Sequence, residues 1–90
     1  MSKNLFEPGQ ESVSIYVATS KYGGHYSLNV YNTAGERVKN LDDRELTAPF
    51  QHSYLWDGRN QFGEKCASGM YIVYLTEPYG SRLARVLLIR

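Results

Sequence analysis

Two histidines and one cysteine are the residues of this chain best suited to catalysis. His25, His52 and Cys66 could in principle provide a thiolate nucleophile and an imidazole base. Each histidine, however, falls in an alternating stretch typical of a strand, with no nucleophile motif beside it. Ser20 and Ser68 also lack the Gly-x-Ser-x-Gly context of an exposed serine nucleophile. We therefore expect no catalytic centre and predict that the chain is not an enzyme.

Oxygen-bearing side chains after the single tryptophan could hold a cation. Asp57, Asn60 and Glu64 supply the oxygens, but a calcium loop places its ligands at alternate positions, where Arg59 and Gln61 stand here. We interpret Asp57 instead as the first residue of a turn. Its carboxylate would accept hydrogen bonds from the backbone amides of that turn. No phosphate-binding loop or metal-ligand cluster is evident in the sequence, so no cofactor or metal is expected.

Tyrosines offer a binding surface of a different kind. By the alternation of their strands, Tyr16, Tyr31 and Tyr74 are predicted to face away from the core. Exposed aromatic rings could contact a partner domain or stack weakly on a glycan. The alternative is that these rings form cross-strand pairs that stabilise a sheet.

Alternating apolar residues predict short strands as the elements that position these side chains. Turn signals recur roughly every 8–12 residues, the spacing of a β-sandwich or barrel. The charged stretch from Asp42 to Phe50 is predicted to be a crossover loop between sheets. Residues 1–10 are interpreted as a lead-in or linker and residues 11–90 as one domain. We expect strands over residues 12–17, 25–32, 36–41, 51–57, 70–76 and 82–90, with a further short strand over 65–67.

Trp56 is predicted to lie in the core, because it shares a strand face with other inward residues. Burying its ring against Tyr71 and its neighbours would contribute roughly 2–3 kcal/mol. The alternative is an exposed tryptophan that stacks on sugars. Three glycines and one aspartate are assigned to the turns around this core: Gly35, Gly58, Gly69 and Asp57.

Composition and charge exclude several classes of function. The formal net charge of +1 gives no field that would attract nucleic acid or an anionic membrane. No apolar run approaches the roughly 20 residues that span a bilayer. Met1 to Gln10 lacks the features of a signal peptide, so an export signal would lie upstream. The single cysteine, Cys66, cannot form an internal disulfide and is expected to be inert.

Two longer stretches of the chain form recognisable motifs. Residues 28–38, followed by Leu41, are similar to the pattern L-x-I-Y-D-x-x-G-x-x-V-x-x-L. Residues 56–60, with Gly63 and residues 68–71, are similar to the pattern W-D-G-R-D-x-x-G-x-x-x-x-S-G-x-Y. Both motifs resemble those of a known family, the immunoglobulin-like domain of the flagellar hook-capping protein (FlgD-like). The closing strand over 85–90 and the lead-in around Phe6 are similar to the family as well. Three positions depart from the family pattern: Leu5, Asn32 and Cys66.

The resemblance implies an immunoglobulin-like, fibronectin type III-like antiparallel sandwich of six or seven strands. It implies a non-catalytic structural or docking module, appended to an exported or surface protein of a bacterium. Such modules serve in accessory, anchoring or sorting roles, as in type 9 secretion tails. An assembly scaffold, as in the hook cap, is the alternative, and a carbohydrate-binding module is a further one. The expected partners are neighbouring domains or protein subunits.

Overall fold

The computed structural model describes residues 12–89 of the chain. The predicted lead-in over residues 1–10 lies outside this range. In the described part every regular element is a β-strand, which confirms the all-β prediction. The strands are β1 (Val13–Thr19), β2 (Gly24–Tyr31), β3 (Arg37–Leu46), β4 (Phe50–Trp56), β5 (Gly69–Glu77) and β6 (Gly80–Leu88).

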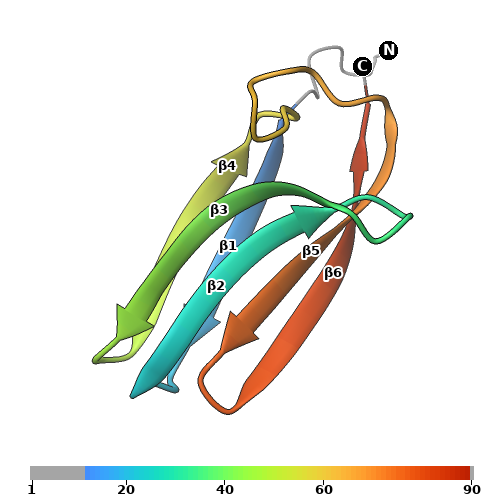
Figure 1. Cartoon of the computed structure of the whole chain (residues 1–90). Helices are drawn as coiled ribbons and strands as arrows, with labels where there is room; N and C mark the ends of the chain where they lie inside the picture. The colour runs from blue at the N-terminus through green and yellow to red at the C-terminus, as the bar shows by residue number, and fades with distance from the viewer. Residues whose placement is uncertain (1–11, 90) are drawn as a thin grey trace.

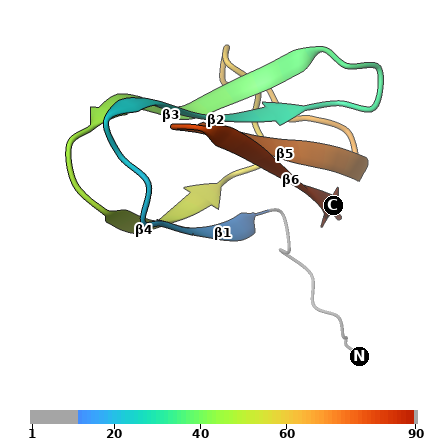
Figure 2. The same cartoon turned by 90° about the horizontal axis from the view of Figure 1, so that it is seen from below.

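The six strands form two antiparallel sheets that lie face to face (Figures 1 and 2). One sheet has two strands in the order β1-β4, and the other has four in the order β3-β2-β5-β6. The end-on view of Figure 2 shows β1 and β4 in one layer and the other strands above them. This confirms the predicted sandwich, with β5 inside its sheet between β2 and β6.

The core lies between the layers, and on β2 and β5 the inward residues follow the two-residue period of a strand. On β2 and β5 the inward pairs Leu28–Leu75 and Val30–Val73 face each other directly. All four side chains are buried. Residues that sit directly across an antiparallel pair share one face of the sheet, so the pairing places them on the interior side together. The remaining core residues are Val17, Tyr26, Leu46, Trp56, Tyr71 and Leu88.

The prediction of a crossover loop over residues 42–50 is wrong. β3 continues to Leu46 and pairs with β2 as far as Gly24, and β4 begins at Phe50. The chain does cross between the two sheets here, but through residues 47–49 alone. The charges were misleading because β3 is an edge strand, on which carboxylates can lie at the solvent side of a regular ladder.

The short strand expected over residues 65–67 is also wrong. A single antiparallel bridge, Arg59 to Lys65, joins the two arms of this loop. The predicted hairpin of β2 and β3 is present, and its turn is closed by the amide of Gly35, which donates to the carbonyl of Asn32 at 3.1 Å. Within residues 12–89, no helix is long and apolar enough to cross a membrane.

Candidate functional site

The loop after β4 uses its oxygens within itself. The amide of Arg59 donates to Asp57 Oδ1 at 3.1 Å. Asn60 Oδ1 accepts hydrogen bonds from the amides of Phe62 and Glu64, while Asn60 Nδ2 donates to Glu64 Oε1. Of the side chains considered as cation ligands, Asp57 and Asn60 therefore form Asx turns, and Glu64 accepts a hydrogen bond from Asn60. Residues 12–89 contain no group of three or more His, Cys, Asp or Glu placed to hold a metal.

Trp56 anchors this loop from the core. Its side chain is 0% exposed, and its ring meets that of Tyr71 edge to face with centroids 5.1 Å apart. The indole Nε1 donates to the carbonyl of Arg59 at 2.9 Å, and the Tyr71 phenol donates to the carbonyl of Ala67 at 2.7 Å. Both rings thus hold the backbone of the loop. No face of the indole is open for sugar stacking.

Glycines at the ends of this loop adopt backbone angles that other residues avoid. Gly58 has φ +74°, directly after Asp57, and the carbonyl of Gly58 accepts the amide of Cys66 at 2.8 Å. Gly69 has φ +152° where β5 begins. Gly58 lies in a bend after β4, whereas Gly69 is the first residue of β5 and pairs with Leu88 on β6.

The candidate catalytic residues lie in separate surroundings. His25 contacts Asp43 through Nε2 at 2.5 Å and Glu45 through Nδ1 at 3.0 Å. His52 has ring contacts with Phe50 and Tyr54 on its own strand. Cys66 is partly buried against the core cluster. These contacts bring neither imidazole to the thiol.

The three tyrosines proposed as contact residues do not share one surface. Tyr16 lies on β1 with 65% of its surface exposed, and its phenol donates to Gln51 on β4 at 2.7 Å. Tyr31 and Tyr74 lie on the other sheet, on β2 and β5. Their rings pair edge to face with centroids 6.3 Å apart. Tyr31 and Tyr74 therefore form the cross-strand aromatic pair that was the alternative to a binding role for these tyrosines.

A band of exposed apolar residues runs beside this tyrosine pair on the outer side of β5 and β6. Met70 pairs with Leu87 and Tyr74 pairs with Leu83, so the four side chains share the outer face. Leu83 and Leu87 are 56% and 58% exposed, and Met70 is 47% exposed. We call this surface, together with Ile72 and Tyr31, the β5–β6 face.

The β5–β6 face is hollowed at one end and positively charged. A shallow apolar hollow lies between Tyr31, Ile72 and Tyr74 and the β2–β3 turn. Arg85 lies within the face, directly across from Ile72 in the strand register. Arg37 lies at the margin of the face, directly across from Tyr31. Tyrosine, methionine and arginine are the residues enriched at protein interfaces. Patches of exposed apolar residues mark interaction sites on soluble domains.

A polar network between the sheets was not predicted from the sequence. Tyr54 on β4 donates its phenol to Asp42 Oδ2 on β3 at 2.6 Å, and the Tyr26 phenol lies 2.8 Å from that of Tyr54. Burial alone would raise the pKa of Asp42, but hydrogen bonds from Tyr54, the Asp43 amide and Arg44 lower it overall. Burial, followed by the bond to Asp42, raises the pKa of Tyr54. The network is therefore an ionised carboxylate held by neutral phenols.

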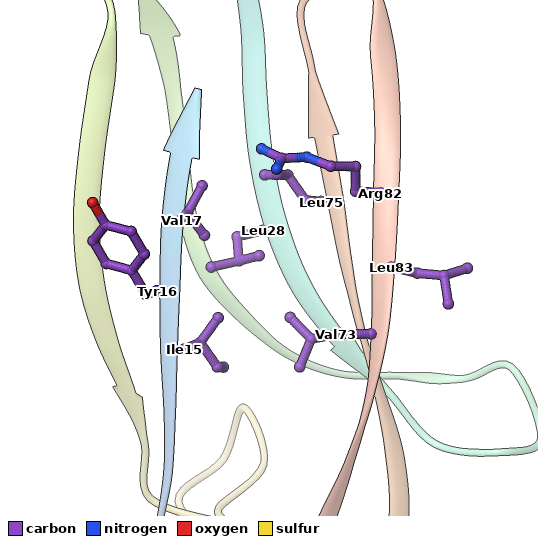
Figure 3. A pocket seen from close by; sticks show the side chains of 9 residues that line it. Ile15, Tyr16, Val17, Leu28, Val73, Leu75, Arg82 and Leu83 are labelled. Atoms are coloured by element: carbon purple, nitrogen blue, oxygen red, sulfur yellow. The ribbon is translucent and has the colours of Figure 1, made fainter. Parts of the chain in front are cut away.

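The opposite side of the sandwich is open between β1 and β6. Figure 3 shows Ile15, Val17, Leu28, Val73 and Leu75 pointing into the space between the sheets, while Tyr16 and Leu83 point away from it. The cavity here has a volume of about 220 Å³.

Arg82 closes one end of this open side. It donates to Glu77 Oε2 at 2.8 Å and to the carbonyl of Ala18 on β1 at 2.9 Å. Burial would raise the pKa of Glu77, but bonds from Thr19 and Arg82 lower it. Glu77 is therefore ionised and holds the guanidinium across the gap.

Comparisons with known proteins agree with the fold. The crystal structure of FlgD from Xanthomonas campestris, described as giving insights into the hook capping essential for flagellar assembly, is 26% identical. The match has a TM-score of 0.56 and covers 89% of this chain and 56% of that one, so the chain spans little more than half of that protein.

A second solved structure is PorZ, a surface component of the type-IX secretion system of Porphyromonas gingivalis. It is 28% identical over 72% of this chain and 8% of that one, with a TM-score of 0.48. No curated protein matches the sequence. The model of the FlgD Ig-like domain matches residues 2–81. The chain therefore belongs to the FlgD Ig-like domain family, a family of structural modules.

Proposed function

We propose that this domain is a non-catalytic docking module that binds a protein partner through the β5–β6 face. The exposed band of Met70, Leu83 and Leu87 beside the Tyr31–Tyr74 pair carries the proposal. Exposed apolar groups gain free energy when a partner removes them from water, at roughly 25 cal/mol per Å². The module would act within a bacterial protein located at the cell surface or outside the cell.

The charge of the face specifies the chemistry of the partner. Arg85 lies within the apolar band and Arg37 at its margin. A partner surface with an apolar centre and carboxylates opposite these arginines would complement both features. This surface would belong to a neighbouring domain of the same protein or to another subunit of an assembly.

The structural relative FlgD supports an assembly role, because it is described in connection with the hook capping essential for flagellar assembly. An assembly scaffold and an appended accessory module would use the same face, and they differ in whether the partner is a repeating subunit. Glycan binding is less favoured, because the rings of Tyr31 and Tyr74 stand at 83° to one another and do not form a flat platform.

The experiment replaces Leu83 and Leu87 by lysine in the full-length protein within the organism that produces it. Both side chains are exposed, so the melting temperature should change little. We expect the variant to separate from its native assembly in size-exclusion chromatography of solubilised cells. Leu55→Lys is the matched control, because Leu55 is 66% exposed on the other sheet. Retention of the assembly by the double variant would contradict the proposal.

A further inference from the structure

β6 is an edge strand of the four-stranded sheet. Among the described residues it pairs with β5 alone, in a register that runs without a shift along its length. The pairs of an antiparallel ladder alternate between pairs that exchange both backbone hydrogen bonds and pairs that exchange none. Glu77 and Gly80 close the hairpin and exchange theirs, because the proline between them has no amide hydrogen for the other arrangement. Leu83, Arg85 and Leu87 therefore direct their amides and carbonyls away from β5, toward the free edge.

The interior of the sandwich is uncovered beside this edge. Ala84 lies directly across from the buried Val73 and so faces inward, yet it is exposed. The cavity of about 220 Å³ lies between β6 and β1, and Leu28, Val73 and Leu75 point into it (Figure 3). A strand added at the free edge of β6 would direct every second side chain toward this cavity. The volume accepts an aromatic or branched side chain, since cavities of about 150 Å³ bind benzene.

Arg85 determines the charge that an added strand must carry. Its neighbours on the outer side of β6 are Leu83 and Leu87, which are both more than half exposed. Arg85 forms no ion pair with any residue of the part of the chain that the structure describes. A guanidinium in an apolar band is best satisfied by a carboxylate directly across from it. β6 itself contains no carboxylate, so the same strand of a second copy would not supply one.

We propose that the free edge of β6 binds an extended segment of a partner protein by antiparallel strand addition. On its outer side this segment carries a carboxylate across from Arg85, between apolar side chains across from Leu83 and Leu87. Its alternate side chains are apolar, and one of them fills the cavity between β6 and β1. Strand addition draws affinity from main-chain hydrogen bonds and specificity from alternate side chains. The inference rests on the proposed function, because the outer side chains of the segment would cover part of the β5–β6 face.

A synthetic peptide of about nine residues, the length of β6, is the probe. It carries isoleucine at the inner positions, tyrosine, glutamate and tyrosine at the three central outer positions, and a solubilising ethylene glycol chain at one end. Hydrogen exchange of the full chain is followed amide by amide by NMR. We expect the amides of Leu83, Arg85 and Leu87 to exchange freely in the chain alone, and about tenfold more slowly or more with the peptide in excess.

N-methylated peptides separate strand addition from other ways of docking. Methyl groups on the amides of the glutamate and the two tyrosines remove the hydrogens that bond β6, and this peptide should give no protection. Methyl groups on the isoleucine amides, which point away from β6, should leave the protection intact. Equal protection by both methylated peptides would overturn strand addition and leave docking through the β5–β6 face in place.

Two further outcomes would also overturn strand addition. One is slow exchange of the three β6 amides in the chain without peptide, because the edge would then be covered already. The other is the absence of protection by the unmethylated peptide in excess. The lysine variant of Leu83 and Leu87 tests docking through the β5–β6 face separately from either result.

Charge reversal tests the assignment of Arg85. Arg85→Glu should weaken binding of the glutamate peptide about tenfold or more, because like charges then lie directly across from each other. A peptide with lysine in place of its glutamate should bind this variant more tightly than it binds the unsubstituted chain. Lys65→Glu, in the loop after β4, is the matched control and should leave binding of the glutamate peptide unchanged. Unchanged binding by Arg85→Glu would overturn the acidic chemistry assigned to the partner.

Discussion

The Tyr54 phenol donates a hydrogen bond of 2.6 Å to the carboxylate of Asp42 and thereby joins the two sheets of the sandwich. Tyr54 belongs to β4 in the two-stranded sheet, and Asp42 belongs to β3 at the edge of the four-stranded sheet. Arg44 adds an ion pair to the same carboxylate, with Nη2 3.1 Å from Oδ2. A polar contact therefore closes the side of the molecule on which β3 and β4 lie.

Tyr54→Phe should lower the free energy of unfolding by about 1–3 kcal/mol, since a hydrogen bond to a charged group is lost. Urea unfolding at neutral pH measures the change. Tyr16→Phe is the control, because its phenol bonds Gln51 at the surface, and it should shift stability by about 0.5 kcal/mol or less. Equal losses of stability in the two variants would show that the hydrogen bond to Asp42 stabilises the fold no more than a surface hydrogen bond does.

The same contact predicts a pH dependence. The pKa of Asp42 is lowered in the folded protein, so its contribution is present above the ordinary value of 3.8 and is lost as the pH falls through the lowered value. The difference in stability between the unsubstituted chain and Asp42→Asn should therefore shrink in acid. Unfolding curves at neutral pH and near pH 3 measure it, and a difference that grows in acid would contradict the assignment.

Trp56→Ala should reduce the free energy of unfolding by about 3–5 kcal/mol, because it leaves a cavity at the fully buried indole. It also removes the indole bond to the Arg59 carbonyl that holds the loop. For a domain of this size the loss is comparable to the whole stability. Thermal melting by circular dichroism measures it, with Leu55→Ala as the exposed control. A melting temperature equal to that of the parent would contradict the core assignment.

Gly35→Ala should cost about 1–2 kcal/mol through backbone strain alone. Gly35 has φ +86°, and an added Cβ would meet no atom within 4 Å. Gly24→Ala is an informative comparison, because its Cβ would lie 3.2 Å from Pro78 Cβ and its cost would come from a steric contact instead. Gly35→Asn should recover part of the loss, since asparagine tolerates this conformation. No recovery would show that strain is not the cause.

His25 should titrate above its ordinary pKa of 6.5. The hydrogen bond to Glu45 raises the pKa, slight burial opposes the rise, and the charge of Asp43 adds to it. The stability that this group contributes is present below pH 6.5 and is lost as the pH rises through the raised value. An NMR titration should give a lower pKa for His25 in Glu45→Gln. The control Glu64→Gln, in the loop after β4, should leave it unchanged.

The sequence predicted the sandwich well where inward and outward residues alternate along a strand, as they do on β1 and β5. Val30 and Val73 show the pattern, and both are buried across from each other. The prediction failed for the second half of β3, because the charged residues at 42–46 were interpreted as part of a loop. Charges indicate exposure and say little about backbone pairing, which here comes from register with β2.

The candidate surface was predicted only in part. Alternation placed Tyr16, Tyr31 and Tyr74 away from the core, but the order of strands in the sheets decides which of them are neighbours. Leu83 and Leu87 alternate with Val86 and Leu88, so periodicity places them on the outer side of β6. It does not show that they lie beside Met70 and Tyr74, because that depends on the pairing of β5 with β6. The Tyr54–Asp42 contact joins strands of different sheets, which no local pattern reveals.

The most direct test of docking through the β5–β6 face is site-specific photo-cross-linking in intact cells. A photoreactive phenylalanine analogue at position 83 should form an adduct with one defined protein, and the same analogue at position 55 on the other sheet should form none. Mass spectrometry of the adduct identifies the partner and the contacted peptide, in which we expect a carboxylate near Arg85. No adduct at position 83, or equal adducts at both positions, would contradict the account.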